Sequence, residues 1–245
     1  MPLPRRAGCS VVFGRAIERG WRVIHSPAGG LILISFVLAA ACDGDSEAEH
    51  QLNVPSMDAE GLASGPYSGM HAKMEKTIFG IDIIKVDIRF GERTAERLEE
   101  LVAGREYSSA LADSVVSIVL DTRDALLVVD IEYGVDVQRF LEESRANLRT
   151  AADAGLIPAT VFSEVSQNLG PWFEFLEARG LKEGDRLIYR IRGDTFRTMF
   201  ITDGGQTLLD QTDPSGNERR LAILAGYLAP GTDLREDLIE SLFED

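Results

Sequence analysis

The chain has 245 residues, of which 44% are hydrophobic and 27% are charged, so it can bury a core in one large domain or two small ones. This composition excludes a collagen-like chain, a disulfide scaffold and a wholly disordered chain. Residues 42–245 hold 20 Lys and Arg against 39 Asp and Glu, a net charge of −19. Because so acidic a body is repelled by phosphate backbones, we exclude nucleic-acid binding.

An uncharged stretch of fourteen residues runs from Ala28 to Ala41, after five arginines. As a helix it would be about 21 Å long, shorter than the roughly 30 Å hydrocarbon layer of a bilayer. It is therefore typical of a signal peptide rather than of a membrane span. The alanines that precede Cys42 resemble a bacterial lipobox, in which the cysteine is lipidated and becomes the mature N-terminus. We expect residues 1–41 to be a lipoprotein signal peptide; a plain secretory signal and an uncleaved anchor helix are the alternatives.

The next segment, residues 42–71, is polar, rich in small residues and without hydrophobic periodicity, so we expect a flexible tether. A folded body at 72–245 would follow. The protein would then be exported and anchored by lipid on Cys42, with the body facing the periplasm or the cell exterior. The body contains no cysteine, which excludes a disulfide or a thiolate metal site there.

Hydrophobic periodicity in the body predicts an α+β domain. We expect strands at 76–90 and 125–133 and a three-strand antiparallel meander at 183–193, 195–205 and 206–212. We expect helices at 94–102, 108–120, 136–155, from Thr160 with a kink or restart at Gly170–Pro171, and at 218–228 and 233–243, with Asp136 capping the third. This order lacks the alternation of a doubly wound parallel sheet, so it favours helices packed on one sheet.

Common catalytic and metal-binding motifs are missing from the sequence, including HExxH, CxxC, EF-hand and GxSxG patterns and a phosphate-binding glycine loop. We therefore expect no metal and no cofactor. Asp82 stands out because it shares a strand face with aliphatic residues, where a carboxylate needs a cationic partner or has a raised pKa. An ion pair is the structural interpretation, and proton transfer or ligand anchoring is the functional one.

Several strings resemble the chalcone isomerase-like family, in particular its bacterial branch. They are IFGIDIIKVDIRF as the first core strand, ALLVVDIEYGVDVQRFLEESRAN as strand and long helix, FLEARGLKEGDRLIYRIRG before the meander, and RRLAILAGYLAPGTDLREDLIESLF as the closing helices. The resemblance implies an open-faced β-sandwich, in which a large antiparallel sheet carries helices on one face and a cleft lies between the two layers.

Plant members of that family close a chalcone into a flavanone without a cofactor, using arginine, threonine, tyrosine and asparagine. Of this set only the asparagine matches, at Asn147; the threonine falls at Asp82, the tyrosine at Phe140, and no arginine occurs near Met70–Lys73. Phe140 cannot hold a catalytic water, and a charged Asp82 would repel an anionic substrate. The resemblance therefore argues against flavanone formation here.

The implied cleft would be lined by Phe140, Ser144 and Asn147 on the long helix, opposite Ile84, Val86 and Phe200. The alternative is that these side chains fill the core; a cavity above roughly 300 Å³ would distinguish the two. We expect a non-catalytic lipoprotein that binds a small apolar ligand such as a fatty acid, the ligand class the resemblance implies. One alternative is a cofactor-independent intramolecular lyase or isomerase with Asp82 as base and Asn147 as orienter. The other is a module that binds an envelope protein.

Overall fold

The computed structural model describes residues 59–75, 82–232 and 234–244, without the side chains of Glu75 and Asp82. Six strands are present: β1 (Gly69–Glu75), β2 (Asp82–Phe90), β3 (Asp124–Ile131), β4 (Arg186–Arg192), β5 (Thr195–Ile201) and β6 (Thr207–Asp213). The helices are α1 (Glu92–Val102), α2 (Ser109–Leu120), α3 (Val137–Asp153), α4 (Ala159–Phe173), α5 (Asn217–Leu228) and α6 (Arg235–Glu240), with a 3₁₀ turn η1 (Glu174–Leu176) after α4. The predicted signal peptide and Cys42 lie outside the described residues.

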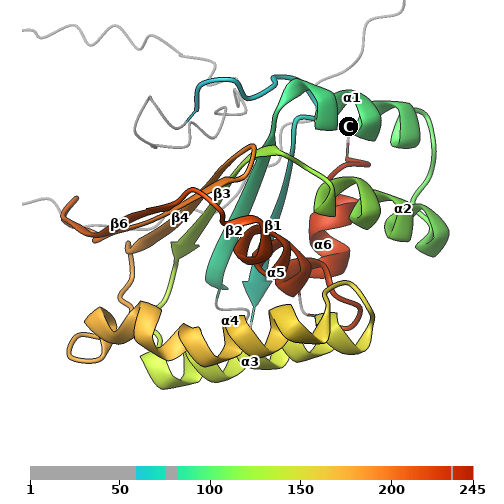
Figure 1. Ribbon diagram of the computed structural model, residues 1–245. Coiled ribbons are helices and arrows are strands. Elements are labelled where there is room, and N and C mark those ends of the chain that lie inside the picture. The colour runs from blue at the N-terminus through green and yellow to red at the C-terminus, as the bar shows by residue number, and fades with distance from the viewer. Residues whose placement is uncertain (1–58, 76–81, 233, 245) are drawn as a thin grey trace, which may run out of the picture. The chain divides into compact units, whose positions relative to one another are not determined.

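The six strands form one sheet in sequence order, and every neighbouring pair is antiparallel. The described helices cover one face of this sheet (Figure 1). The α+β architecture predicted from the sequence, a large antiparallel sheet with helices packed on one face, is therefore confirmed. The three-strand meander also lies where the periodicity predicts it, as β4, β5 and β6.

Alternation along the strands divides the sheet into two unlike faces. Val86, Ile88 and Phe90 of β2 are fully buried beneath the helices and belong to the main core. On the other face, Lys85 and Asp87 form an ion pair of 3.1 Å. A second, smaller apolar cluster lies on that face, comprising Leu126, Val128, Ile188 and Met199, with Leu62 packed against it. The central strands are thus buried on both sides.

Strand β1 was not predicted, and its first residues, Gly69–His71, fall in the segment we expected to be a tether. It lacks a β-branched run, so its strand structure comes from pairing with β2, from Gly69 opposite Arg89 to Met74 opposite Ile84. The strands approach closely at Gly69, where a Cβ atom would lie 2.7 Å from the Ile88 carbonyl oxygen. A glycine is therefore needed for this pairing.

One helix differs in detail from the prediction, and the long helix agrees with it. The helix from Ala159 continues through Pro171 and gives way to η1 after Phe173, so it does not restart at Gly170–Pro171 as one of the two predicted outcomes had it. The long helix α3 begins at the predicted cap, where the Asp136 carboxylate accepts hydrogen bonds from the backbone N–H groups of Gln138 and Arg139. Its closest helical neighbours are α4 and α5.

The loop that enters β4 is held by Asp185, a fully buried carboxylate. It accepts two hydrogen bonds from the Arg179 guanidinium, at 2.7 and 2.9 Å, and one from the Lys182 backbone N–H at 2.7 Å. Desolvation raises the pKa of Asp185, but these hydrogen bonds outweigh it, so the pKa lies below its ordinary value. This network connects the end of the α4–η1 segment to the middle of the sheet.

We predict that Asp185→Asn lowers the free energy of unfolding at pH 7 by about 3 kcal/mol, because it leaves Arg179 without its charged partner. Since the pKa is lowered on folding, the stabilisation is complete above about pH 4 and is lost as the pH falls through the folded-state pKa. The gap between the two proteins in urea unfolding should therefore narrow below pH 4.

Asp194→Asn provides the control, because Asp194 forms an exposed ion pair with Arg123. It should cost less than about 1 kcal/mol. An Asp185→Asn cost as small as this would show that the buried network is not needed for stability.

Candidate functional site

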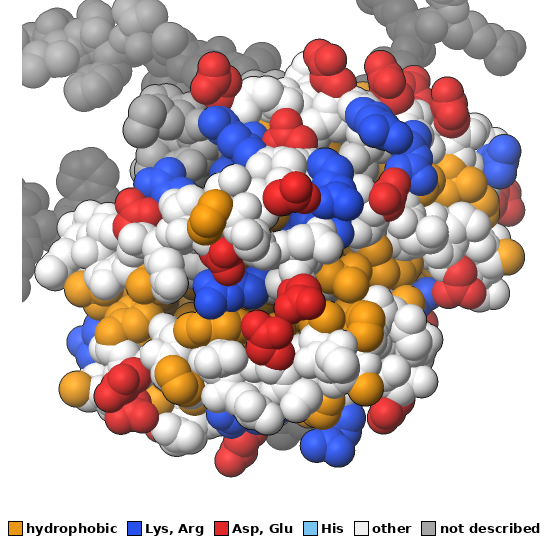
Figure 2. Space-filling model, in the orientation of Figure 1, with side chains coloured by type: hydrophobic (Ala, Val, Ile, Leu, Met, Phe, Trp, Pro, Cys, Tyr) orange, Lys and Arg blue, Asp and Glu red, His pale blue; other side chains and the backbone are white. Residues whose placement is uncertain are grey.

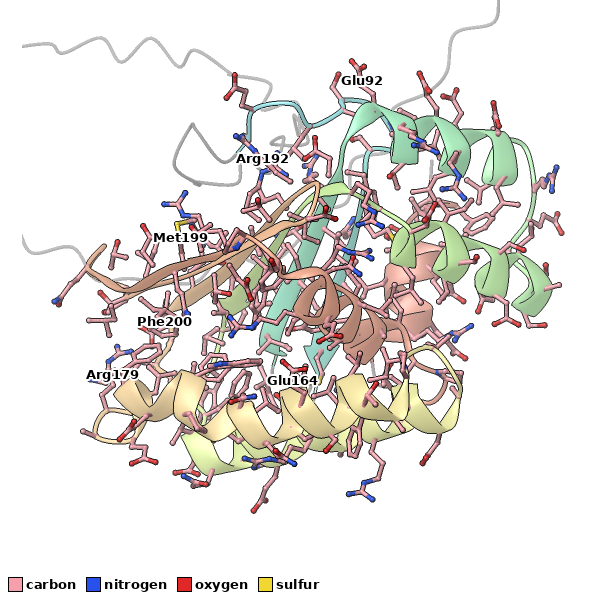
Figure 3. All side chains as sticks on the ribbon, viewed as in Figure 1. Glu92, Glu164, Arg179, Arg192, Met199 and Phe200 are labelled. Carbon is pink, nitrogen blue, oxygen red and sulfur yellow. The ribbon has the colours of Figure 1, made fainter. Side chains whose placement is uncertain are left out.

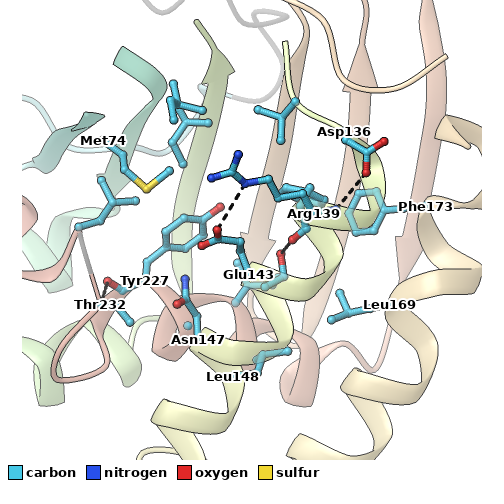
Figure 4. A pocket seen from close by; sticks show the side chains of 18 of the residues that line it. Met74, Asp136, Arg139, Glu143, Asn147, Leu148, Leu169, Phe173, Tyr227 and Thr232 are labelled. Atoms are coloured by element: carbon cyan, nitrogen blue, oxygen red, sulfur yellow. Dashed lines mark hydrogen bonds and ion pairs between the residues drawn. The ribbon is translucent and has the colours of Figure 1, made fainter. Parts of the chain in front are cut away.

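A cavity of about 380 Å³ lies where α3 and α5 meet one end of the sheet (Figure 4). The strands contribute Met74 of β1, Ile83 and Ile84 of β2, and Tyr189 of β4. The helices and loops contribute Tyr133–Asp136, Arg139, Phe140, Glu143, Ser144, Asn147, Leu148, Leu169, Phe173, Ala222, Ile223, Gly226, Tyr227, Thr232 and Leu234. A cavity of this size is within the range of small-molecule sites.

The wall formed by α3 follows from helical spacing. The lining residues of this helix lie three or four positions apart, a spacing that places them on one helical face. They are Phe140, Ser144, Asn147 and Leu148. The ring of Phe140 meets that of Phe173 edge to face, with centroids 5.3 Å apart. The aromatic pair fixes α3 against α4 and gives the cavity an apolar side.

The opposite wall belongs to α5, where small residues leave the space open. Gly226 lies on this wall, and a Cβ atom built there would have Leu148 Cδ2 of α3, at 3.9 Å, as its nearest neighbour. Ala222 stands one turn earlier on the same face. Side chains of ordinary size at these two positions would occupy the volume that now forms the cavity.

Charged groups gather at the outer end of the cavity. Asp136 and Arg139 are exposed, and the Tyr133 side chain is 56% exposed. Arg139 Nε lies 3.7 Å from Glu143 Oε1 on the next turn of α3 (Figure 4). The charges at the mouth therefore face solvent and one another.

Elsewhere, hydrophobic side chains form a band just above α4, among acidic and basic residues, on the face shown in Figure 2.

The polar groups deeper in the cavity are uncharged. Ser144 Oγ donates to the Phe140 carbonyl at 2.8 Å, and Thr232 Oγ1 donates to the Ala229 carbonyl at 2.8 Å. The Asn147 amide and the hydroxyls of Tyr189 and Tyr227 also line the cavity. Burial raises the pKa of the Tyr189 hydroxyl, and Tyr227 raises it further; burial likewise raises the pKa of Tyr227. Both phenols stay neutral at physiological pH.

The structure brings together four of the residues that we expected to bind a ligand, since Ile84, Phe140, Ser144 and Asn147 all line the cavity. Val86 is fully buried in the main core and does not line it. Asp82 begins β2, but its side chain lies outside the described residues, so its part in a site stays a prediction.

Phe200 is a correction, because it does not line the cavity. It is fully buried in the core against Phe175, with ring centroids 5.4 Å apart, and the Arg179 guanidinium lies over its ring (Figure 3). Phe200 does lie on the face of the sheet that the helices cover, as predicted. It belongs to β5, however, whereas the strand residues that line the cavity come from β1, β2 and β4. Alternation along a strand shows which face a residue is on, but not how far it is from a site on that face.

Sequence reasoning missed Tyr189, Tyr227 and Gly226. Tyr189 alternates with Leu187 and Ile191 on β4, and Tyr227 follows Ile223 by four residues on α5, so the periodicity assigns both to the buried side. No sequence pattern shows that these two tyrosines, 38 residues apart, meet Asn147 of α3 at one cavity.

Within residues 59–75, 82–232 and 234–244, no three His, Cys, Asp or Glu side chains lie where they could hold a metal ion together. In that same part of the chain, no helix has the length and apolar character that crossing a bilayer requires.

No model of a known protein family matches the sequence, and no curated protein sequence matches it. Among solved structures, the chain is similar to a fatty-acid binding protein from Arabidopsis thaliana, with a TM-score of 0.46 and 10% sequence identity. That match covers 76% of this chain and 92% of the Arabidopsis chain. What this protein binds has to be argued from its own cavity.

We predict that two of the five tyrosines resist ionisation during an alkaline titration until the chain unfolds. The reason is that the pKa values of Tyr189 and Tyr227 are raised on folding. Their stabilising effect is present below about pH 10 and is lost as the pH rises beyond it. Near-ultraviolet absorbance measures the ionisation, and Tyr189→Phe and Tyr227→Phe should each remove one late-ionising group. Variants that leave the late fraction unchanged would show that other tyrosines are the buried ones.

Proposed function

We propose that this protein is an exported, lipid-anchored and non-catalytic binding protein whose cavity holds a small apolar ligand such as a fatty acid. The observation that carries the proposal is the cavity of about 380 Å³ between α3, α5 and the sheet. Its walls consist mainly of aliphatic and aromatic side chains, and its few polar groups come from α3, α5, β4 and the neighbouring loops. This is the arrangement typical of small-molecule sites.

An acyl chain fits this distribution of polarity. The apolar chain would lie between Phe140, Leu148 and Ile223, where it leaves water at a gain of about 0.8 kcal/mol for each buried CH₂ group. A carboxylate would remain at the mouth, close to Arg139, where solvent reduces the cost of keeping it charged. The ligand would thus enter chain first.

A binding role also fits the chemistry of the lining residues. The described lining contains no histidine, cysteine or lysine, and its cation Arg139 is already paired with Glu143. Phe140 offers no hydroxyl to hold a water against a bound substrate. These features support a cavity that contains a ligand without reacting with it.

We predict that Gly226→Leu weakens the binding of a fluorescent fatty-acid analogue about tenfold or more, equivalent to at least about 1.4 kcal/mol. The added side chain would project from α5 towards Leu148 and fill the cavity. Fluorescence titration of the purified full chain measures the affinity, and competition by unlabelled dodecanoate confirms the site.

The matched control is Gly226→Ala, whose methyl group makes only an ordinary contact with Leu148. It should bind as the wild type does and gain up to about 1 kcal/mol of stability from higher helix propensity. Equal binding by the leucine and alanine variants would place the ligand elsewhere and refute the proposal.

The membrane anchor has its own test. We predict that Cys42→Ser moves the protein from the membrane fraction to the soluble fraction of the producing bacterium, because a serine cannot carry the thioether-linked lipid. Mass spectrometry of the wild-type N-terminus should find a lipid-modified Cys42. A soluble wild type with an unmodified Cys42 would leave a plain secretory signal as the better interpretation.

A further inference from the structure

Apart from the exposed Tyr133 at the mouth, three uncharged polar side chains that line the cavity have no hydrogen-bond partner among the described residues: the Asn147 amide and the hydroxyls of Tyr189 and Tyr227. They come from α3, β4 and α5, so different parts of the chain bring them to one space. Figure 4 shows Asn147 and Tyr227 on the side of the cavity where α3 faces α5. The other uncharged side-chain donors there, Ser144 and Thr232, are bonded to backbone carbonyls.

When an apolar ligand displaces water from such a group, leaving the group without a partner costs about 1–3 kcal/mol. Tyr189 as a whole is only 4% exposed, and its ring packs against that of Phe196 with centroids 5.5 Å apart. Three such groups line the cavity. A bound molecule whose acceptor atom reaches them would avoid that cost.

These groups favour one kind of polar atom. Each phenol and the amide nitrogen can donate a hydrogen bond, and a carbonyl oxygen has two lone pairs with which to accept two of them. A buried anion would lack compensation, because the charged lining residues Asp136, Arg139 and Glu143 gather at the exposed mouth. Raised pKa values keep both phenols protonated and able to donate.

We infer that Tyr189, Tyr227 and Asn147 form a recognition site for an uncharged carbonyl oxygen, so that the ligand is an apolar molecule carrying a ketone, ester or amide within its apolar body. This inference rests on the proposed binding function and names the class of ligand. An acyl chain with an oxo group part of the way along it belongs to this class. A plain hydrocarbon fills the same space but leaves the three donors unsatisfied.

The test compares undecan-6-one with undecane, two chains of equal length that differ in one central carbonyl group. Both are titrated into the full chain by displacement of the fluorescent fatty-acid analogue. The wild type should bind the ketone about tenfold more tightly than the alkane. Tyr189→Phe, Tyr227→Phe and Asn147→Leu should each reduce that preference several-fold and leave the affinity for the alkane unchanged.

Tyr107→Phe is the matched control, since it removes the hydroxyl of an exposed tyrosine that does not line the cavity and should leave the preference unaltered. Each tyrosine-to-phenylalanine change removes only an oxygen, so thermal unfolding should confirm that the variants fold. Equal binding of ketone and alkane, as expected if water satisfies the three donors, would overturn the inference while the binding function stands. Failure of the analogue and of both ligands to bind would refute the binding function itself.

Discussion

The contact between α3 and α5 is the interaction on which the cavity depends. Where these helices meet, Leu148 of α3 faces Gly226 of α5, and the small α5 residue keeps the space between the helices and the sheet unfilled. Helices normally pack 8–10 Å apart with side chains of both filling the gap. Here the α5 residue that faces Leu148 has no side chain, while Ile223 and Tyr227 of the same helix line the cavity beside it. The remaining space is bounded on its other sides by β1, β2 and β4.

A hollow of this kind lowers stability, because the atoms that line it lose packing contacts. The rest of the domain is well packed around it. The main core extends from β1 to β5 and includes all six helices, and the edge-to-face rings of Phe140 and Phe173 fasten α3 to α4. The buried Asp185 network holds the connection from η1 to β4. A cavity enclosed by packed elements needs little rearrangement to take up a ligand, which lowers the cost of binding.

Charged, apolar and uncharged polar side chains all line the cavity, and they would act on different parts of a bound ligand. Charged groups stand at the solvent-facing mouth, apolar side chains form the walls, and uncharged donors lie further in. The apolar walls would bury the apolar part of a ligand, whereas Tyr189, Tyr227 and Asn147 would distinguish ligands that carry a carbonyl group from those that do not. Affinity and specificity thus depend on different residues, which is why they can be measured separately.

Much of the domain could be predicted from its sequence, because helix and strand periods, the Asp136 cap and the glycine turns are local signals. They located α1, α2, α3, β3 and the meander, and they placed Phe140, Ser144 and Asn147 on one helical face. Strand β1 was missed because its structure comes from pairing with β2. Phe200 was wrongly assigned to the cavity because the alternation of residues along a strand shows which face of the sheet a side chain is on, but not which part of that face. Only the tertiary structure decided that Gly226 leaves a cavity and that Tyr189, Tyr227 and Asn147 meet there. Whether residues from α3, β4 and α5 line one cavity depends on how these elements pack against one another. Local periodicity carries no information about the packing of elements that are far apart in the sequence.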